Sequence, residues 1–195
     1  MKLSKHSVSL AAIILLAGGC ASMSGAEPMA AKPMAANPMV GGAAMYPTKN
    51  IVENAVNSKD HTTLVAAVKA AGLVDTLMSA GPFTVFAPTN AAFAKLPAGT
   101  VDTLLKPENK ATLTAVLTYH VVPGTLTAAD LAAMAKANGG KAVLTTVQGA
   151  KLTVWGKDGK WYVTDAKGGQ AQITIADVRQ SNGVIHVVDS VLLPG

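Results

Sequence analysis

The amino-acid sequence predicts an α+β fold in which helices precede a sheet of short strands. Two observations lead to this prediction. Between residues 61 and 131, apolar side chains recur at the spacing of helices that bury one face. From residue 141 onward, the chain consists of short runs rich in Val, Ile, Thr, Trp and Tyr, separated by turn residues. Strands this close together favour an antiparallel sandwich, because parallel neighbours need a helix between them.

The first long helix is expected in HTTLVAAVKAAGLVDTLMSAG, residues 61–81. Asp60 or Thr62 can cap its start, since a short polar side chain accepts a hydrogen bond from a free amide of the first turn. Gly72 is expected to interrupt the helix, and Gly81 with the proline that follows it ends the pattern.

A short apolar strand is expected at residues 83–87, where the sequence FTVFA is halted by Pro88. Thr89 or Asn90 then caps a helix that contains Phe93. The sequence leaves both capping alternatives open, because either side chain can accept the bond from a free amide.

Two further helical segments precede the sheet. One runs from residue 101 to TYHVVPG, residues 118–124, with a restart at Pro107, a residue favoured in the first turn of a helix. The other begins at Thr127, which forms with Asp130 the pattern of a capping box.

The strands of the second half follow clear turn signals. They are expected at residues 141–147, 151–155, 160–164, 170–178 and 183–193, with a hairpin turn at Gln148, Gly149 and Ala150. Side chains alternate along the last strand, so His186 and Asp189 lie on opposite faces. We expect His186 to be a partly buried residue that is hydrogen-bonded within the sheet. Asp189 is expected to be a paired carboxylate, because an unpaired buried charge is costly.

The N-terminal residues have the composition of an export signal. Residues 1–19 place Lys2 and Lys5 ahead of an apolar run, which is shorter than the roughly 20 residues that span a bilayer. The segment LLAGGC resembles the signal of bacterial lipoproteins, although Ala17 stands where leucine is usual. This resemblance implies lipidation of Cys20 and an exported protein anchored in the outer membrane, facing the periplasm or the cell surface. Without acylation of Cys20, the protein is secreted.

Residues 20–48 are predicted to be a tether, and residues 49–195 a single domain. The tether sequence repeats a Pro-Met-Ala-like unit at Pro28, Pro33 and Pro38, with few large apolar side chains other than methionine. Such a composition cannot bury enough surface to offset the entropy of ordering. Its methionines lack accompanying cysteine or histidine, which argues against a site for a soft metal such as Cu(I).

Charge and motifs argue against several classes of function. The formal net charge of +5 falls to +3 without residues 1–19, and the lysines are scattered, so no nucleic-acid partner is expected. The sequence contains no nucleophile elbow, no HExxH and no phosphate-binding loop. We therefore expect no enzyme, no catalytic residue, no metal site and no cofactor.

Three segments together resemble the signature blocks of fasciclin-like domains. They are FTVFAPTNAAFAKLP at 83–97, TYHVVPG at 118–124 and NGVIHVVDSVLLP at 182–194. With AAGLVDTL before the first block, the resemblance extends over nearly all of residues 50–195. Asn90 stands where aspartate is common, which keeps the capping role and removes the charge. The resemblance implies a compact β-sandwich, described as a wedge, with flanking helices in the N-terminal half, and extracellular adhesion or matrix interaction.

Two functions follow as alternatives. The first is a membrane-tethered module that contacts a protein or matrix polymer at the cell surface through many weak contacts. The second is a periplasmic binding protein that holds a small apolar ligand or lipid between the helices and the sandwich. Tyr119 and His120 match a segment that the resemblance links to integrin contact in animal members. They are either contact residues or a structural clamp with buried rings and hydrogen-bonded polar tips.

Overall fold

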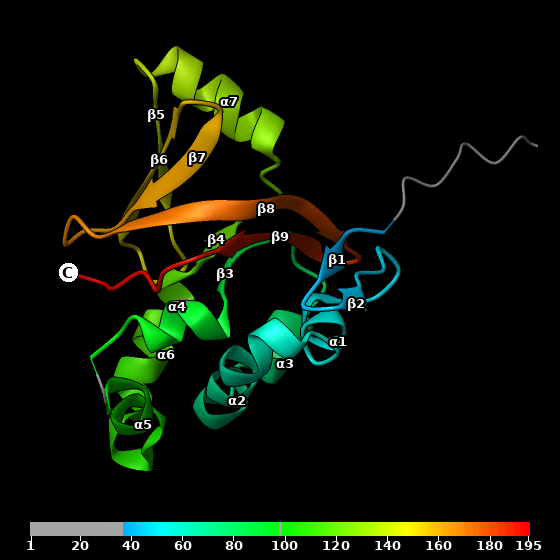
Figure 1. Ribbon diagram of the computed structural model, residues 1–195, viewed down its shortest axis with the longest axis vertical. Helices are drawn as coiled ribbons and strands as arrows, with labels where there is room; N and C mark the ends of the chain where they lie inside the picture. The colour runs from blue at the N-terminus through cyan, green and yellow to red at the C-terminus, as the bar shows by residue number, and fades with distance from the viewer. Residues whose placement is uncertain (1–36, 98) are drawn as a thin grey trace, which may run out of the picture. The chain divides into compact units, whose positions relative to one another are not determined.

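The computed structural model describes residues 37–97 and 99–195 (Figure 1). The predicted signal segment, the lipidation site Cys20 and the first part of the predicted tether lie outside these residues. The helices are α1 (Ile51–Ala55), α2 (Thr62–Ala71), α3 (Val74–Met78), α4 (Asn90–Ala94), α5 (Thr100–Leu105), α6 (Lys110–Tyr119) and α7 (Ala128–Ala137), with 3₁₀ turns at Lys59–His61 and Pro107–Asn109. Within the described ranges, no helix is both long enough and apolar enough to cross a membrane.

Seven strands form one hydrogen-bonded sheet in the order β4-β3-β9-β8-β7-β6-β5. They are β3 (Phe83–Pro88), β4 (Val121–Pro123), β5 (Lys141–Thr145), β6 (Lys151–Lys157), β7 (Lys160–Thr164), β8 (Gln170–Gln180) and β9 (Gly183–Val188). The predicted α+β class is confirmed. Neighbouring strands are antiparallel except for β3 and β9, which run parallel, so the expectation of an entirely antiparallel sheet is wrong at this one pair. The long connection between these two strands supplies the crossover that a parallel pair needs.

The parallel pair joins strands that are far apart in the sequence. Each β3 residue pairs with the residue 100 positions later, from Phe83 with Gly183 to Pro88 with Val188. A side chain at position 183 would collide with the carbonyl oxygen of Phe83. Glycine therefore permits the close approach of the two backbones at the start of the pair.

The sheet bends until its two edges meet. Strand β8 is 11 residues long and has two register shifts against β9, and such bulges increase twist and bending. The amide of Val147, just after β5, donates to the carbonyl of Val121 in β4 at 2.8 Å. One continuous sheet thus encloses a core between its two halves, which gives the sandwich-like arrangement that was predicted.

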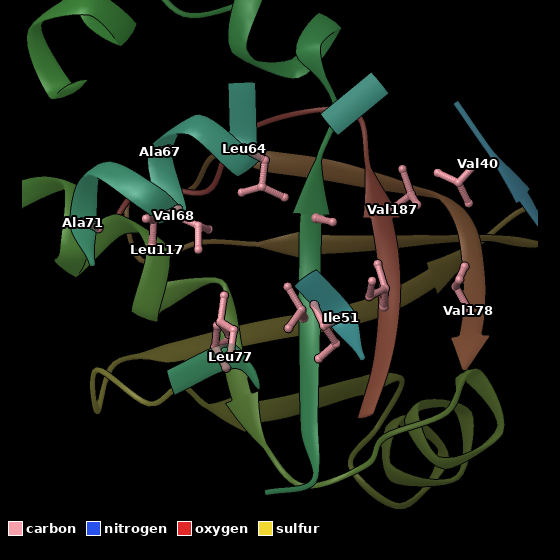
Figure 2. Close-up of a cluster of buried hydrophobic side chains, with 14 of the residues drawn as sticks. Val40, Ile51, Leu64, Ala67, Val68, Ala71, Leu77, Leu117, Val178 and Val187 are labelled. Carbon is pink, nitrogen blue, oxygen red and sulfur yellow. The ribbon is translucent and has the colours of Figure 1, made fainter. Parts of the chain in front are cut away.

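A first core of apolar side chains lies between α1, α2, α3, α6 and one face of β3, β8 and β9 (Figure 2). Its buried residues are Val40, Met45, Ile51, Leu64, Ala67, Val68, Ala71, Leu77, Val85, Ala87, Phe93, Leu113, Leu117, Val121, Val178, Ile185 and Val187. Ile185 and Val187 in β9 both point into this core, as the predicted alternation requires.

A second core lies inside the bent sheet and is closed by α7, which packs on β5 and β6 (Figure 1). Its buried residues are Phe86, Tyr119, Val122, Leu131, Ala135, Ala142, Leu144, Leu152, Val154, Val163, Ala171, Ile173, Val188 and Leu192. Thr127 and Asp130 form the capping box that was predicted for the start of α7. The cap fixes the point at which the chain turns to cover this core.

Residues 37–48 belong to the folded domain and not to the tether. They form a small hairpin of β1 (Met39–Val40) and β2 (Ala43–Ala44). The side chains of Val40 and Met45 are only 3% and 2% exposed and lie in the first core. The predicted boundary at residue 48 is therefore too late, because Val40 and Met45, at the end of the Pro-Met-Ala-like segment, pack into the first core.

Candidate functional site

His120 lies at the carboxyl end of α6 and ties it to the chain that follows β9. Its ring is 2% exposed. Nδ1 donates to the carbonyl of Val116 at 2.7 Å, and Nε2 accepts from the amide of Leu192 at 3.0 Å. These partners select the neutral tautomer with its hydrogen on Nδ1. Burial lowers the pKa of His120 to about 4, although the Val116 carbonyl and the Asp165 carboxylate act in the opposite direction.

Tyr119 is fully buried beside His120, and the two rings meet edge to face with centroids 6.5 Å apart. Its hydroxyl donates to the carbonyl of Lys151 at 3.0 Å and accepts from the amide of Ala166 at 2.8 Å. Tyr119 thereby joins the end of α6 to the start of β6 and to the loop after β7. In this structure neither ring of the TYHVVPG segment reaches the surface.

His186 lies in β9 and is completely buried, more deeply than the sequence led us to expect. Its ring stacks on Phe86 of the neighbouring strand β3, with centroids 5.6 Å apart and planes at 28°. Nε2 donates to the carbonyl of Leu126 at 2.9 Å, and Nδ1 accepts from the amide of Asp177 at 3.4 Å. Burial lowers the pKa of His186. Both ring nitrogens are thus occupied by backbone groups.

Asp189 follows β9 and bonds to groups other than His186. One carboxylate oxygen accepts from the amide of Gln172 at 2.8 Å, and the other forms an ion pair with Lys95 at 3.0 Å. Partial burial raises the pKa of Asp189, but hydrogen bonds from the Gln172 amide and the Lys95 ammonium lower it by a larger amount. The pKa of Asp189 therefore lies below its usual value. His186 and Asp189 therefore do not form an acid–base pair.

Thr89 is the residue that caps α4. Its hydroxyl oxygen accepts a hydrogen bond from the amide of Ala92 at 3.2 Å. Of the two predicted caps, Thr89 and Asn90, Thr89 is therefore the one observed, and Asn90 is the first residue of the helix. The side chain of Asn90 is left free to bond elsewhere.

Asn90 reaches across to the amino end of α2. Its Oδ1 accepts from the amide of Thr63 at 3.0 Å, and its Nδ2 donates to the carbonyl of Lys59 at 2.8 Å. The expected cap of α2 by Asp60 or Thr62 is wrong, because neither side chain caps the helix and a residue from a distant part of the chain does so instead. The amide both donates and accepts here, which a carboxylate cannot do.

One face of β5, β6, β7 and the first half of β8 points away from the second core, and its side chains are exposed or partly exposed. We call it the outer face. Its side chains are Lys141, Val143, Thr145, Lys151, Thr153, Trp155, Lys157, Lys160, Tyr162, Thr164, Gln170 and Gln172. Trp155 stacks on Tyr162 with centroids 4.9 Å apart and planes at 24°, and its Nε1 donates to the hydroxyl of Thr164 at 2.9 Å. Two aromatic rings are thus held side by side at the surface.

The outer face carries four lysines and no acid, and the acids next to it in the sequence are Asp158 in the β6–β7 turn and Asp165 after β7. Lys157 pairs with Lys160 beside the aromatic rings, Lys141 is the direct neighbour of Trp155, and the fourth lysine begins β6. The ion pairs found among the described residues lie elsewhere. The positive charge of this face is therefore not neutralised within the face.

Trp155 and Tyr162 were not among the residues predicted to be functional, although the sequence carries a signal for them. Asp158 and Gly159 form a two-residue turn, and such a turn fixes the register of its hairpin. With Lys157 opposite Lys160, Trp155 must lie opposite Tyr162. The aromatic pair could have been found from that register.

An apolar cavity of about 70 Å³ lies within the first core, between the helices and the sheet. Its walls come from α1, α2, α3, the end of α6, β3 and β9, and Val40, Met45 and His120 are among the residues that line it. A cavity of about 150 Å³ accepts benzene, so this one has room for smaller molecules. It lies where the alternative hypothesis placed a ligand.

His61, in the wall of this cavity, is 3% exposed and has one ring nitrogen without a partner. Nδ1 is hydrogen-bonded to the hydroxyl of Ser58 at 2.9 Å. Nε2 is buried and makes no hydrogen bond to any described residue. Burial lowers the pKa of His61, and the nearby Ala87 backbone and Asp60 carboxylate offset only part of that effect.

The chemistry of these sites is that of hydrogen bonding and packing. In the part of the chain that the structure describes, no three His, Cys, Asp or Glu side chains come together to hold a metal ion. His120 and His186 use both ring nitrogens for backbone partners. Among the described residues, the outer face and the cavity are two places with unoccupied binding capacity.

Comparison with known proteins gives a consistent result. The model of the fasciclin domain matches residues 59–194. A relative named Protein sll1483, from Synechocystis sp., is 51% identical over 152 residues, which cover 78% of this chain and 77% of that protein. Cell surface glycolipoprotein MPB83 of Mycobacterium bovis is 35% identical over 185 residues, which cover 92% of this chain and 72% of that protein.

A solved structure shares the fold. It is a FAS1 domain pair from the insect cell adhesion molecule fasciclin I, with a TM-score of 0.66 and 20% sequence identity. The match covers 74% of this chain and 51% of that structure, so this chain spans about half of the domain pair. None of these matches indicates a catalytic family. The predicted resemblance is confirmed, and the chain belongs to the fasciclin domain family.

Proposed function

We propose that this protein is a membrane-tethered interaction module that acts outside the cytoplasm and mediates adhesion, matrix contacts or contacts with other proteins. The outer face is the observation that carries the proposal. It presents a fixed aromatic pair and four lysines to solvent, without an ion pair in the described structure. Membership of a family known in adhesion-related proteins supports the same function.

The tether in this proposal is a lipid on Cys20, followed by residues 20–36. The name of the mycobacterial relative, a cell surface glycolipoprotein, supports this location for that protein and by similarity for this one. Many domains on one membrane raise the effective concentration of binding sites, so each contact can be weak. The protein then faces the periplasm or the cell surface.

Tyr119 and His120 have a structural role in this proposal, as do His186 and Asp189. The first three are buried, and all four side chains hold backbone groups from distant segments. A partner that approached from outside would find neither ring of the TYHVVPG segment accessible. The binding surface is therefore sought elsewhere, on the outer face.

Removal of the folded domain tests the proposed function. Cells carrying the full chain are compared with cells whose chain keeps the anchor and lacks residues 37–195, at matched amounts in the membrane. We expect attachment to surfaces or to neighbouring cells to fall when the domain is removed. Unchanged attachment across several kinds of surface would contradict the adhesion function.

The cavity favours a second candidate function, the binding of a small apolar molecule. Xenon is a suitable probe, because apolar cavities of this kind bind it. We expect xenon to shift the methyl NMR signals of Val68 and Ile185, and Met45→Ala to enlarge the cavity and strengthen the effect. Met39→Ala is the matched control, because Met39 lies in the same hairpin and is 58% exposed. If the methyl chemical shifts of Val68 and Ile185 do not change with xenon in either Met45→Ala or Met39→Ala, this function is ruled out.

A further inference from the structure

The outer face places its groups in ordered rows across the strands. Lys141, Trp155, Tyr162 and Gln172 are successive cross-strand neighbours on β5, β6, β7 and β8. Three strand spacings make this row roughly 14 Å wide. The stacked rings form its centre, with a charged group at one end and an amide at the other.

The lysines are too widely spread to serve one small anion. Lys151 and Lys157 stand at the two ends of β6, six residues apart, which is about 20 Å along an extended strand. Lys160 lies directly opposite Lys157 on β7. Charges at this spacing suit a chain that carries a negative charge at repeated intervals.

The remaining side chains of the face are mostly neutral hydrogen-bonding groups. They are Thr145, Thr153, Thr164, Gln170 and Gln172. Threonine hydroxyls and glutamine amides both donate and accept hydrogen bonds, as do the hydroxyl groups of a sugar. The ring faces of Trp155 and Tyr162 that are not stacked on each other offer flat apolar contact beside them. The face thus combines charge, hydroxyl-matching groups and a stacking platform.

We propose that the outer face of β5–β8 binds an anionic polysaccharide, with Trp155 and Tyr162 stacking on sugar rings and the four lysines pairing with its carboxylate or sulfate groups. This inference rests on the proposed interaction function and names its partner class. Four lysines with no acid on the face itself, and Asp158 as a single acid in the adjoining turn, give the complementarity, and salt screens such exposed pairs.

Binding of a polyuronate oligomer to the full chain tests the proposal, with neutral dextran of equal length as the comparison probe. We expect the polyuronate to bind, the dextran to bind at least about ten-fold more weakly, and polyuronate binding to weaken as salt rises from about 0.05 M to about 0.5 M. Equal binding of both probes, or no binding of polyuronate at low salt, would overturn the proposal.

Two sets of lysine variants locate the site. The test variant carries Lys141→Gln, Lys151→Gln, Lys157→Gln and Lys160→Gln. The control variant makes the same change in net charge at Lys59, Lys106, Lys110 and Lys136. We expect the test variant to bind polyuronate about ten-fold more weakly and the control to lose much less. Equal losses would mean that net charge, and not this face, is responsible.

The aromatic contribution is tested separately. Trp155→Ala is expected to weaken binding about ten-fold, whereas Trp155→Phe keeps a ring and stays within about three-fold. Trp155→Ala can also disturb the β6–β7 hairpin, but the lysine variants leave the aromatic pair intact and decide the question alone. Single-stranded DNA that binds as tightly as polyuronate, and loses affinity in the same variants, would assign the face to a different polymer.

The cell-attachment assay separates this inference from the function on which it rests. If removal of residues 37–195 abolishes attachment but the four-lysine test variant attaches normally, the adhesion function stands and the outer face is the wrong surface. If both abolish attachment and the control variant does not, both proposals are supported.

Discussion

Two regions of this domain bury a histidine at a helix end, and they differ in how they pair it. At the carboxyl end of α6, both ring nitrogens of His120 are bonded to backbone groups. At the amino end of α2, His61 is bonded through Nδ1 alone, and its Nε2 is buried without a partner among the described residues. Both histidines line the apolar cavity, so the two regions differ in the pairing of the ring and not in access to that cavity.

This difference shows that burial alone does not make a histidine stabilising. A buried polar atom without a partner costs about 1–3 kcal/mol, whereas a paired one contributes about 1 kcal/mol. His120 therefore strengthens its region, and His61 weakens the region around the cavity. The second region is the one in which the fold retains a buried polar atom without a partner among the described residues.

Replacing each histidine by phenylalanine should give the largest contrast. His120→Phe leaves the amide of Leu192 and the carbonyl of Val116 without their partner, so we expect the free energy of unfolding to fall by about 4 kcal/mol. His61→Phe removes the unpaired nitrogen but also the partner of the buried Ser58 hydroxyl, and because these effects oppose each other we expect a change within about 1 kcal/mol of zero. Urea unfolding at pH 7 measures both, and similar losses in the two variants would remove the distinction between the regions.

Lowering the pH tests the buried, neutral state of His120 by titration. Folding holds the pKa of His120 at about 4, below its usual value of 6.5, so the unfolded chain binds the proton more tightly. The stabilisation is complete above pH 6.5 and is lost as the pH falls from 6.5 to 4, by about 3 kcal/mol in all. Urea unfolding across this pH range should show the decrease in the free energy of unfolding. The decrease should be smaller in the His120→Gln variant. A pH-independent free energy of unfolding would contradict the assignment.

Adding one methylene to each core tests whether free space is confined to the first core. Val154 is fully buried in the second core, so Val154→Leu should cost about 2 kcal/mol through overpacking. Val68 lines the cavity, so Val68→Leu should change the free energy of unfolding by less than about 1 kcal/mol. Thermal unfolding of the two variants gives the comparison, and a larger loss for Val68→Leu would mean that the cavity is not available.

The smallest expected effect concerns what holds the amino end of α2. Asn90 supplies the cap through the amide of Thr63 and also bonds the carbonyl of Lys59. Asn90→Ala should therefore cost about 1 kcal/mol, measured by urea unfolding. A loss as small as that of His61→Phe would mean that α2 is held by packing alone.

Patterns within single segments predicted much of the fold. The alternation in β9 assigned Ile185 and Val187 to one face, and both lie in the first core. Gly72, with its left-handed φ of 73°, ends α2 where the sequence indicated a break. Turn signals likewise located the hairpins of the second half. Local sequence suffices for such features because their causes lie within a few residues.

Features that depend on distant partners could not be predicted in this way. The burial of Val40 and Met45 requires a surface formed by α1 and the sheet, and composition alone suggests a tether. The cap of α2 comes from Asn90, 27 residues beyond the amide that it bonds. The unpaired nitrogen of His61 is likewise a property of packing, since nothing in its neighbouring residues distinguishes it from His120.

The candidate surface was predictable only in part. The strands of the outer face were predicted from the sequence, in which the lysines are scattered along the chain. It could not show that four of them share one face with a stacked aromatic pair. That coincidence arises when three turns set the register of four strands at once.

The parallel pairing of β3 and β9 governs when the domain can form. Its two strands lie 100 residues apart, and contacts of such long range slow folding because a large loop must close first. A chain emerging from the ribosome cannot complete the middle of its sheet until β9 has been synthesised. Until then, the edges of β3 and β8 are open to pairing with other chains. Most of the chain therefore exists for a time without its native structure, which is the period in which a chaperone has access to it.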